Sequence, residues 1–266
     1  MILGAGVKRI LATLTALTLL VMYLPLMLVV LNSFNTSRSF AWPPSGLTLE
    51  WWRRAWSSDG AREAVMTSVQ VALASTAIAL VLGTLMSLAL QRYSFFGKNS
   101  VNLLVILPIA LPGIVTGIAL NNAFRGVMGI QLGLLTVIVA HATFCIVTVF
   151  NNVQARLRRM GGSFEEASAD LGAGVWTTFR LVTFPQLRSA LLAGGLLAFA
   201  LSFDEIIVTT FTAGAGTTTL PIWILNNLFR PNQAPIVNVV AVVLILLSIV
   251  PIWIAQKISG DAEGVR

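Results

Sequence analysis

Six long stretches of the sequence carry almost no charge, and each is bounded by charged residues or by clusters of proline, glycine and asparagine. They lie at about residues 10–31, 65–90, 101–123, 134–154, 189–212 and 236–256. Since about 20 apolar residues cross the hydrocarbon core of a bilayer as a helix, each stretch predicts a transmembrane helix. Transmembrane strands would instead show alternating segments of ~10 residues. We expect an all-α polytopic membrane protein with about six transmembrane helices, built as a single domain over residues 1–266.

The composition excludes the main soluble classes. Of the 266 residues, 56% are hydrophobic and 10% are charged, whereas an average soluble protein carries about 25% charged residues. The net charge of +7 is not organised into a basic run with interleaved aromatic residues, so no nucleic-acid partner is expected. The single cysteine, Cys145, allows no disulfide within the chain.

The distribution of lysine and arginine predicts the orientation. If the N-terminus is cytoplasmic, eleven of these residues fall on cytoplasmic segments and six on outer segments. Because lysine and arginine collect on the cytoplasmic side of membrane proteins, both termini are expected in the cytoplasm. The outer loop 32–64 contains four tryptophans, which fit either an interfacial aromatic belt or a docking surface: Trp42, Trp51, Trp52 and Trp56.

Most loops between the predicted spans are short, but residues 155–188 form one long polar segment on the expected cytoplasmic side. Ser163 is followed three residues later by Glu166, a pattern typical of a helix capping box. The expected helix runs over residues 164–171 and stops at Gly172, since glycine accepts the left-handed conformation of a helix C-terminus.

A second short amphipathic stretch, residues 176–182, precedes Pro185 in the same segment. Proline disfavours helix in the residue before it, so this helix is expected to end there. Two short helices joined by a glycine turn would form a compact projection, either a plain surface hairpin or a docking site for a soluble partner. Its length favours docking.

This projection resembles the EAA loop of ABC importer permease subunits, E-A-A-x-x-L-G-A followed by F-x-x-V-x-x-P. The matching residues are Glu166, Ala167, Ser168, Leu171, Gly172, Ala173, Phe179, Val182 and Pro185. Ser168 replaces the second alanine of the motif with another small residue. Residues 95–99, 107–120, 141–147 and 191–214 are similar to the PotC branch of spermidine/putrescine permeases, and more closely to the YdcV-type subunit of putrescine importers.

The resemblance implies a type I ABC importer permease fold in the bacterial inner membrane. The implied partners are the lipid bilayer, a second related permease subunit, two ATPase subunits and a periplasmic substrate-binding protein. The implied function is import of a small organic cation, such as putrescine or spermidine, by alternating access; 4-aminobutyrate or another amine or amino-acid-like solute is the alternative. The coupling residues implied are Glu165, Glu166, Ala167, Asp170, Leu171, Gly172 and Ala173.

No catalytic or metal site is expected in this chain. The sequence lacks the G-x-x-x-x-G-K-[ST] phosphate loop, so ATP and its magnesium are expected on a separate ATPase subunit. His141 and Cys145 are four residues apart and share a helix face, but no further ligands lie near them. A core histidine bonded to a neighbouring helix is favoured over a metal ligand.

Asp204 and Glu205 are the only acidic residues inside a predicted span. A charge inside the membrane costs about 2.5–3.5 kcal/mol on insertion scales, so such residues usually face a cavity or a partner. On a continuous helix the two neighbours would point ~100° apart. Either they contact a cationic substrate on its path, or they bond across helices and hold the gate together.

Two other regions are candidates for the path. The third span would be weakened by Pro108, Pro112, Gly113 and Gly117, which indicates either a hinge lining a cavity or close packing through small residues.

Residues 213–235 predict a short helix at the outer surface anchored by Trp223. There Trp223, Asn226 and Asn227 would contact substrate or simply pack at the interface.

Two other classes of membrane protein fit less well. A self-sufficient secondary transporter usually contains internal repeats, and no repeat is visible. A polytopic enzyme would need a cluster of titratable groups, and one histidine with one acidic pair is too little.

Overall fold

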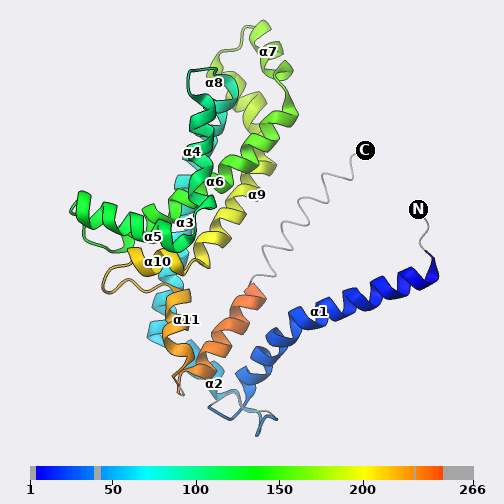
Figure 1. The fold of residues 1–266 in the computed structure, drawn as a ribbon, viewed down its shortest axis with the longest axis vertical. Coiled ribbons are helices and arrows are strands. Elements are labelled where there is room, and N and C mark those ends of the chain that lie inside the picture. The colour runs from blue at the N-terminus through cyan, green and yellow to red at the C-terminus, as the bar shows by residue number, and fades with distance from the viewer. Residues whose placement is uncertain (1–3, 39–42, 231, 248–266) are drawn as a thin grey trace. The chain divides into compact units, whose positions relative to one another are not determined.

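The computed structural model describes residues 4–38, 43–230 and 232–247, and these residues form helices and loops without a regular strand (Figure 1). They divide into two compact units. The first contains the described residues up to Arg62 and those from Ile224 onward, and the second is Glu63–Trp223. The expectation of one domain stays a prediction.

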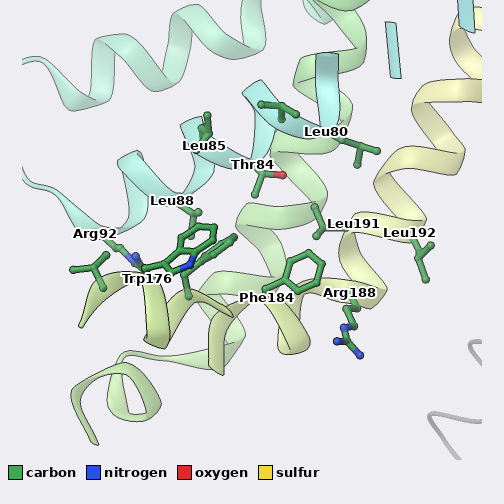
Figure 2. A pocket seen from close by; sticks show the side chains of 13 residues that line it. Leu80, Thr84, Leu85, Leu88, Arg92, Trp176, Phe184, Arg188, Leu191 and Leu192 are labelled. Carbon is green, nitrogen blue, oxygen red and sulfur yellow. The ribbon is translucent and has the colours of Figure 1, made fainter. Parts of the chain in front are cut away.

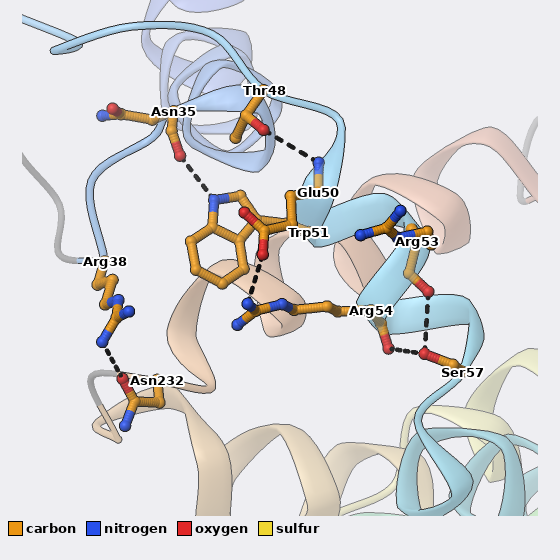
Figure 3. A network of polar contacts seen from close by, with 9 residues as sticks. All are labelled: Asn35, Arg38, Thr48, Glu50, Trp51, Arg53, Arg54, Ser57 and Asn232. Carbon is orange, nitrogen blue, oxygen red and sulfur yellow. Dashed lines mark hydrogen bonds and ion pairs between the residues drawn. The ribbon is translucent and has the colours of Figure 1, made fainter.

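The first unit contains α1 (Ala5–Phe34), the short helix α2 (Glu50–Trp56) and a helix at Ala234–Leu247. None of the most apolar 18-residue window of α1 is buried within its own unit. A polar network fixes the loop between α1 and α2 (Figure 3). Its centre is Trp51, whose indole nitrogen donates a 2.8 Å hydrogen bond to the carbonyl oxygen of Asn35.

The loop tryptophans therefore play different roles. Trp51 is buried and Arg54 lies over its ring at 5.1 Å. The ring of Trp52 stacks on that of Phe34 at 5.3 Å, whereas Trp56 is exposed. Trp42 lies outside the described residues. Among the described tryptophans, Trp56 is therefore the one most exposed for an interfacial belt or a docking surface, and that choice stays a prediction.

The second unit is built around three long helices. They are α3 (Asp59–Arg92), whose first turn lies in the first unit, α6 (Leu134–Met160) and α9 (Phe184–Phe203). Helices α6 and α9 run side by side, with Val149, Leu187 and Ala198 fully buried in the core (Figure 1). Gly83 lets α3 approach α6, because a Cβ there would lie 2.9 Å from the carbonyl oxygen of Ile146.

Two of the predicted spans are interrupted. The third, expected as one helix over residues 101–123, consists of α4 (Lys98–Ala110), α5 (Gly113–Asn121) and the π-helical segment η1 (Asn122–Val127), with a bend of 104° after α4. Pro112 causes the break, because its preceding residue adopts an extended conformation. The fifth, expected over residues 189–212, was also wrong as a continuous helix: α9 ends at Phe203 and α10 covers Ile207–Thr212.

The polar segment expected on the cytoplasmic side, residues 155–188, contains α7 (Ser163–Asp170), α8 (Val175–Thr178) and the π-helical segment η2 (Phe179–Thr183). The predicted capping box was wrong, since α7 begins one residue earlier with Gly162 as an N-cap without a side-chain hydrogen bond. The predicted stop before Pro185 was also wrong. Proline is tolerated in the first turn of a helix, and η2 continues directly into α9, giving one helix over Val175–Phe203.

Among the described residues, four helices are long and apolar enough to cross a membrane, and a fifth span is obtained if α4 and α5 count as one. The predicted sixth span is represented by the helix at Ala234–Leu247, while its remainder, residues 248–256, lies outside the described residues. The expected short outer helix is present as α11 (Leu220–Leu228).

Candidate functional site

The two helix breaks of the second unit adjoin each other. A Cβ added to Gly113, at the start of α5, would lie 3.6 Å from Cγ2 of Ile207 and 3.9 Å from Cγ2 of Val208, at the start of α10. The break after α4 and the break after α9 thus meet at one place. Interrupted helices in a membrane occur where the backbone is covered by protein or lines a water-filled cavity, and transporters use them to bind substrates and ions.

The structure gives Asp204 and Glu205 different environments at this break. Asp204 follows the last turn of α9, where its N–H bonds to the carbonyl oxygen of Ala200 at 3.2 Å and its side chain is exposed. Within the described part of the chain, no hydrogen bond or ion pair involves that carboxylate. Glu205 is half-buried, and its Oε1 accepts a 2.8 Å bond from the N–H of Val208. Glu205 therefore caps the start of α10.

A buried histidine holds the two sides of the break together. His141 of α6 bonds through Nδ1 to Oγ of Ser202 and through Nε2 to Oγ1 of Thr209, each at 2.8 Å. Thr209 already donates its hydroxyl proton to the carbonyl oxygen of Glu205 at 2.9 Å. The histidine Nε2 must then be the donor, and in the neutral ring Nδ1 accepts from Ser202. His141 thus connects the end of α9 to the start of α10.

Helices α5 and α6 also hold α10 by its backbone. The side-chain amide of Asn121 donates a 2.6 Å bond to the carbonyl oxygen of Phe211, and Oγ1 of Thr136 donates a 2.8 Å bond to that of Thr212. Gly117 permits this close approach, because a Cβ there would lie 2.8 Å from the ring of Phe211. The short helix is consequently fixed from both sides, and the glycines of the third span serve packing.

The end of α9 is suited to a cation. The last carbonyl groups of a helix carry a partial negative charge of about −0.5, and Asp204 adds a full one at the same place. The ends of broken helices coordinate cations in this way in transporters. No group of three or more His, Cys, Asp or Glu side chains within the described residues could hold a metal ion.

The other predicted path residues lie on α11. Trp223 is buried rather than displayed as an interfacial anchor. The start of α11 belongs to the second unit, where the N–H of Leu220 bonds to Oγ of Ser68 at 2.8 Å. Asn226 is exposed. A contact of either side chain with substrate stays a prediction.

In the polar segment 155–188, Glu165 docks α7 onto the end of α3 and onto η2. Its carboxylate forms an ion pair with Arg92 at the end of α3 and accepts a 2.6 Å hydrogen bond from Oγ1 of Thr183. Burial alone raises the pKa of the Glu165 carboxyl, but the hydrogen bonds from Arg92 and Thr183 and the charge of Arg92 outweigh it, so the pKa lies below its ordinary value.

Two further residues shape the segment of α7 and α8. Oγ of Ser168 lies 2.9 Å from Oγ1 of Thr178. The serine that departs from the family motif therefore links α7 to α8. Gly172 has a φ of +81°, a left-handed conformation that costs other L-residues ~1–2 kcal/mol. The glycine stop predicted from the sequence is confirmed.

The remaining predicted coupling residues are displayed outward. Glu166, Ala167 and Asp170 are exposed, Ala173 is partly exposed, and Leu171 is 88% exposed. Trp176 of α8 is also exposed and stacks on Phe179 at 5.8 Å. An exposed apolar patch with acidic residues beside it is typical of a protein–protein interface.

Sequence reasoning missed the residues that hold these parts in place. In the sequence, Arg92 is only one of the basic residues from which the orientation was predicted. Thr183, Ser202 and Thr209 give no local signal, because their partners lie far away in the sequence. His141 was expected to bond to a neighbouring helix, and that expectation is confirmed.

Comparison with known proteins matches residues 79–260 to the family described as "Binding-protein-dependent transport system inner membrane component". The chain is 34% identical over 240 residues to the spermidine/putrescine transport system permease protein PotC of Escherichia coli (strain K12), covering 90% of each chain. It is 32% identical over 252 residues to the putrescine transport system permease protein PotI of the same strain, covering 92% of this chain and 89% of PotI.

Among solved structures, the chain is similar to one from a bacterial ABC transporter involved in the import of the acidic polysaccharide alginate. The TM-score is 0.74 at 15% sequence identity, and the similarity covers 97% of this chain and 99% of the other. This likeness confirms the expected permease fold, while the relatives confirm the resemblance to the spermidine/putrescine branch.

Proposed function

Because the chain belongs to the family of binding-protein-dependent transport system inner membrane components, we propose that it is a permease subunit of an ATP-driven importer for a small organic cation of the polyamine class. The observation that carries the substrate class is the exposed carboxylate of Asp204 at the negative end of α9, beside a second helix break. The names of PotC and PotI support the same class.

The proposed assembly has four kinds of component. A second, related permease subunit completes the path, two ATPase subunits bind ATP and magnesium below it, and a periplasmic binding protein delivers substrate from above. The excess of lysine and arginine on one set of loops supports cytoplasmic termini. The apolar surface of α1, of which little is buried in its own unit, supports contact with lipid and with a partner subunit.

The coupling path can be followed through two connections. The exposed side of α7 and α8 would contact the ATPase subunit and move with it when ATP closes the pair. Glu165 and Arg92 pass that movement to α3. The continuous helix Val175–Phe203 passes it, over ~43 Å at 1.5 Å per residue, directly to the break at Asp204.

Asp204 would meet the substrate near the outer end of the path. It lies 16 residues beyond Arg188, or ~24 Å along a helix, which is most of the ~30 Å thickness of the hydrocarbon core. A polyamine released by the binding protein would exchange hydration water for this carboxylate and the terminal carbonyl groups of α9. Movement of α9 then changes which side of the membrane can reach them.

The proposal is tested with the purified complex in lipid nanodiscs, measuring ATP hydrolysis stimulated by the binding protein loaded with putrescine. Glu166→Ala and Gly172→Asp each alter the outward side of the coupling segment and should abolish the stimulation while the complex still assembles. Ser163→Ala, at a position without a cap hydrogen bond, is the matched control and should behave as wild type. Normal stimulation in both altered complexes would refute the coupling role.

A further inference from the structure

An apolar groove of about 1110 Å³ runs along the second unit, between the last turns of α3 and the helix that begins at Val175 (Figure 2). Pockets for small molecules measure ~300–1,000 Å³, so this groove has room for more than a polyamine. Its walls include Leu85 and Leu88 of α3 and Leu191 and Leu192 of α9.

The length of the groove fits one leaflet of a bilayer. Its α3 wall extends from Leu80 to Arg92, which is ~18 Å at 1.5 Å per residue. Half of the ~30 Å hydrocarbon core is ~15 Å. The apolar wall therefore spans about the depth of one leaflet, and Arg92 lies at the end where α3 leaves the apolar region.

The rim carries two arginines in different states. Arg92 is already paired with Glu165. The guanidinium of Arg188 lies 5.6 Å from the centre of the Phe184 ring, its side chain is exposed, and none of the described carboxylates forms an ion pair with it. Figure 2 shows Arg188 beside Phe184 on the α9 side of the groove. Arg188 is thus available to an anion.

This charge also decides what the groove does not bind. A cationic rim repels a polyamine, so the groove is separate from the substrate path at Asp204. Its apolar walls disfavour water, and several of the side chains are well exposed in the chain, including Leu85 and Leu192. Basic pockets between transmembrane helices, next to apolar surface, are recognised by the headgroups of anionic lipids.

We infer that the groove binds an anionic phospholipid, with its acyl chains along the leucines of α3 and α9 and its phosphate at Arg188. The bound lipid would fill the space between α3 and the helix that carries the coupling segment, because Trp176 and Phe179 also line the groove. The charge at Arg188 distinguishes this occupant from a transmembrane helix of a partner subunit, which would offer the groove an apolar surface.

The test uses the complete importer in phosphatidylcholine nanodiscs that contain a trace of phosphatidylglycerol with a photoactivatable group in one acyl chain. After irradiation, mass spectrometry measures labelling of the peptides that contain Leu85 and Leu191. The expected result is labelling at both, competed by unlabelled phosphatidylglycerol and not by added phosphatidylcholine. This readout does not depend on transport, so it can succeed or fail independently of the proposed function.

Arg188→Gln should lower the labelling about fivefold, the ratio expected for one basic side chain against an anionic lipid, and Arg188→Lys should retain it. Arg180→Gln is the matched control, since Arg180 is exposed on η2 but does not line the groove. Equal losses in the two glutamine variants, or equal competition by both lipids, would overturn the inference. So would a photoreactive residue placed at Leu192 that crosslinks to the partner permease instead of lipid.

Discussion

The docking of α7 by Glu165 gives a prediction with a defined size. Glu165→Gln keeps an acceptor oxygen and the side-chain shape but removes the charge that faces Arg92. Hydrogen bonds to charged groups contribute about 1.5–3 kcal/mol. Both side chains of the pair are 26% exposed, so solvent screens part of this interaction and the lower part of the range, about 1.5–2 kcal/mol, applies. Each ~1.4 kcal/mol is a factor of ten in an equilibrium constant.

The opening equilibrium of α7 should therefore rise about ten- to thirtyfold. Hydrogen exchange of the amides of residues 166–170, measured on the assembled importer, reports such local opening. Glu166→Gln is the matched control: Glu166 is the next residue, is exposed and has no part in the ion pair. It should exchange as wild type while weakening the response to the ATPase. Unchanged exchange in Glu165→Gln would refute the docking role.

The same contact predicts a dependence on pH. The folded pKa of Glu165 lies below its ordinary value of 4.5, so the stabilisation is fully present above about that pH. It is lost as the pH falls through the lowered folded value, because protonation removes the charge that Arg92 binds. The opening equilibrium of wild-type α7 should rise in this acidic range, and in Glu165→Gln it should lose that dependence on pH. An identical acid response in both proteins would contradict the assignment.

Three further perturbations have expected outcomes. Gly83→Val places a Cβ 2.9 Å from the carbonyl oxygen of Ile146 and should destabilise the α3–α6 packing by ~1–3 kcal/mol, measured as a lower Tm. The control is Gly126→Ala, where a Cβ meets nothing within 4 Å, and it should leave Tm unchanged. Gly172→Val should reduce ATPase coupling more than Gly172→Asn, since asparagine tolerates the left-handed conformation better; equal effects would contradict the backbone argument. His141→Leu removes two buried hydrogen bonds and should cost about 2–4 kcal/mol with loss of uptake; unimpaired uptake and stability would show that the histidine does not hold the break.

The sequence predicted the helices well where hydropathy alone determines them. The first, second and fourth spans contain long runs without a strong interruption, and α1, α3 and α6 cover them. The helix α7 and the turn after it could be predicted because a glycine turn and an acidic helix are local features. Gly172 could be assigned correctly from its neighbours, since a left-handed turn depends on the residue itself.

The breaks could not be located in the same way. Pro108 and Pro112 both weaken the third span, but only Pro112 ends a helix, whereas Pro108 remains inside α4. The break at Asp204 is bridged by tertiary hydrogen bonds from His141, which lies 61 residues before Ser202. Such distant partners leave no periodic pattern in the sequence. For that reason Asp204 and Glu205 looked equivalent until the structure separated an exposed carboxylate from a helix cap.

The measurement that tests the central claim most directly is ATP-dependent uptake of labelled putrescine by the reconstituted importer with its binding protein. Wild type is compared with Asp204→Asn and with Asp59→Asn, an exposed aspartate in the first turn of α3. The account predicts uptake by wild type and by Asp59→Asn, and loss of uptake in Asp204→Asn with assembly and basal ATP hydrolysis intact. Equal uptake by all three, or no ATP-dependent putrescine uptake by wild type, would contradict it.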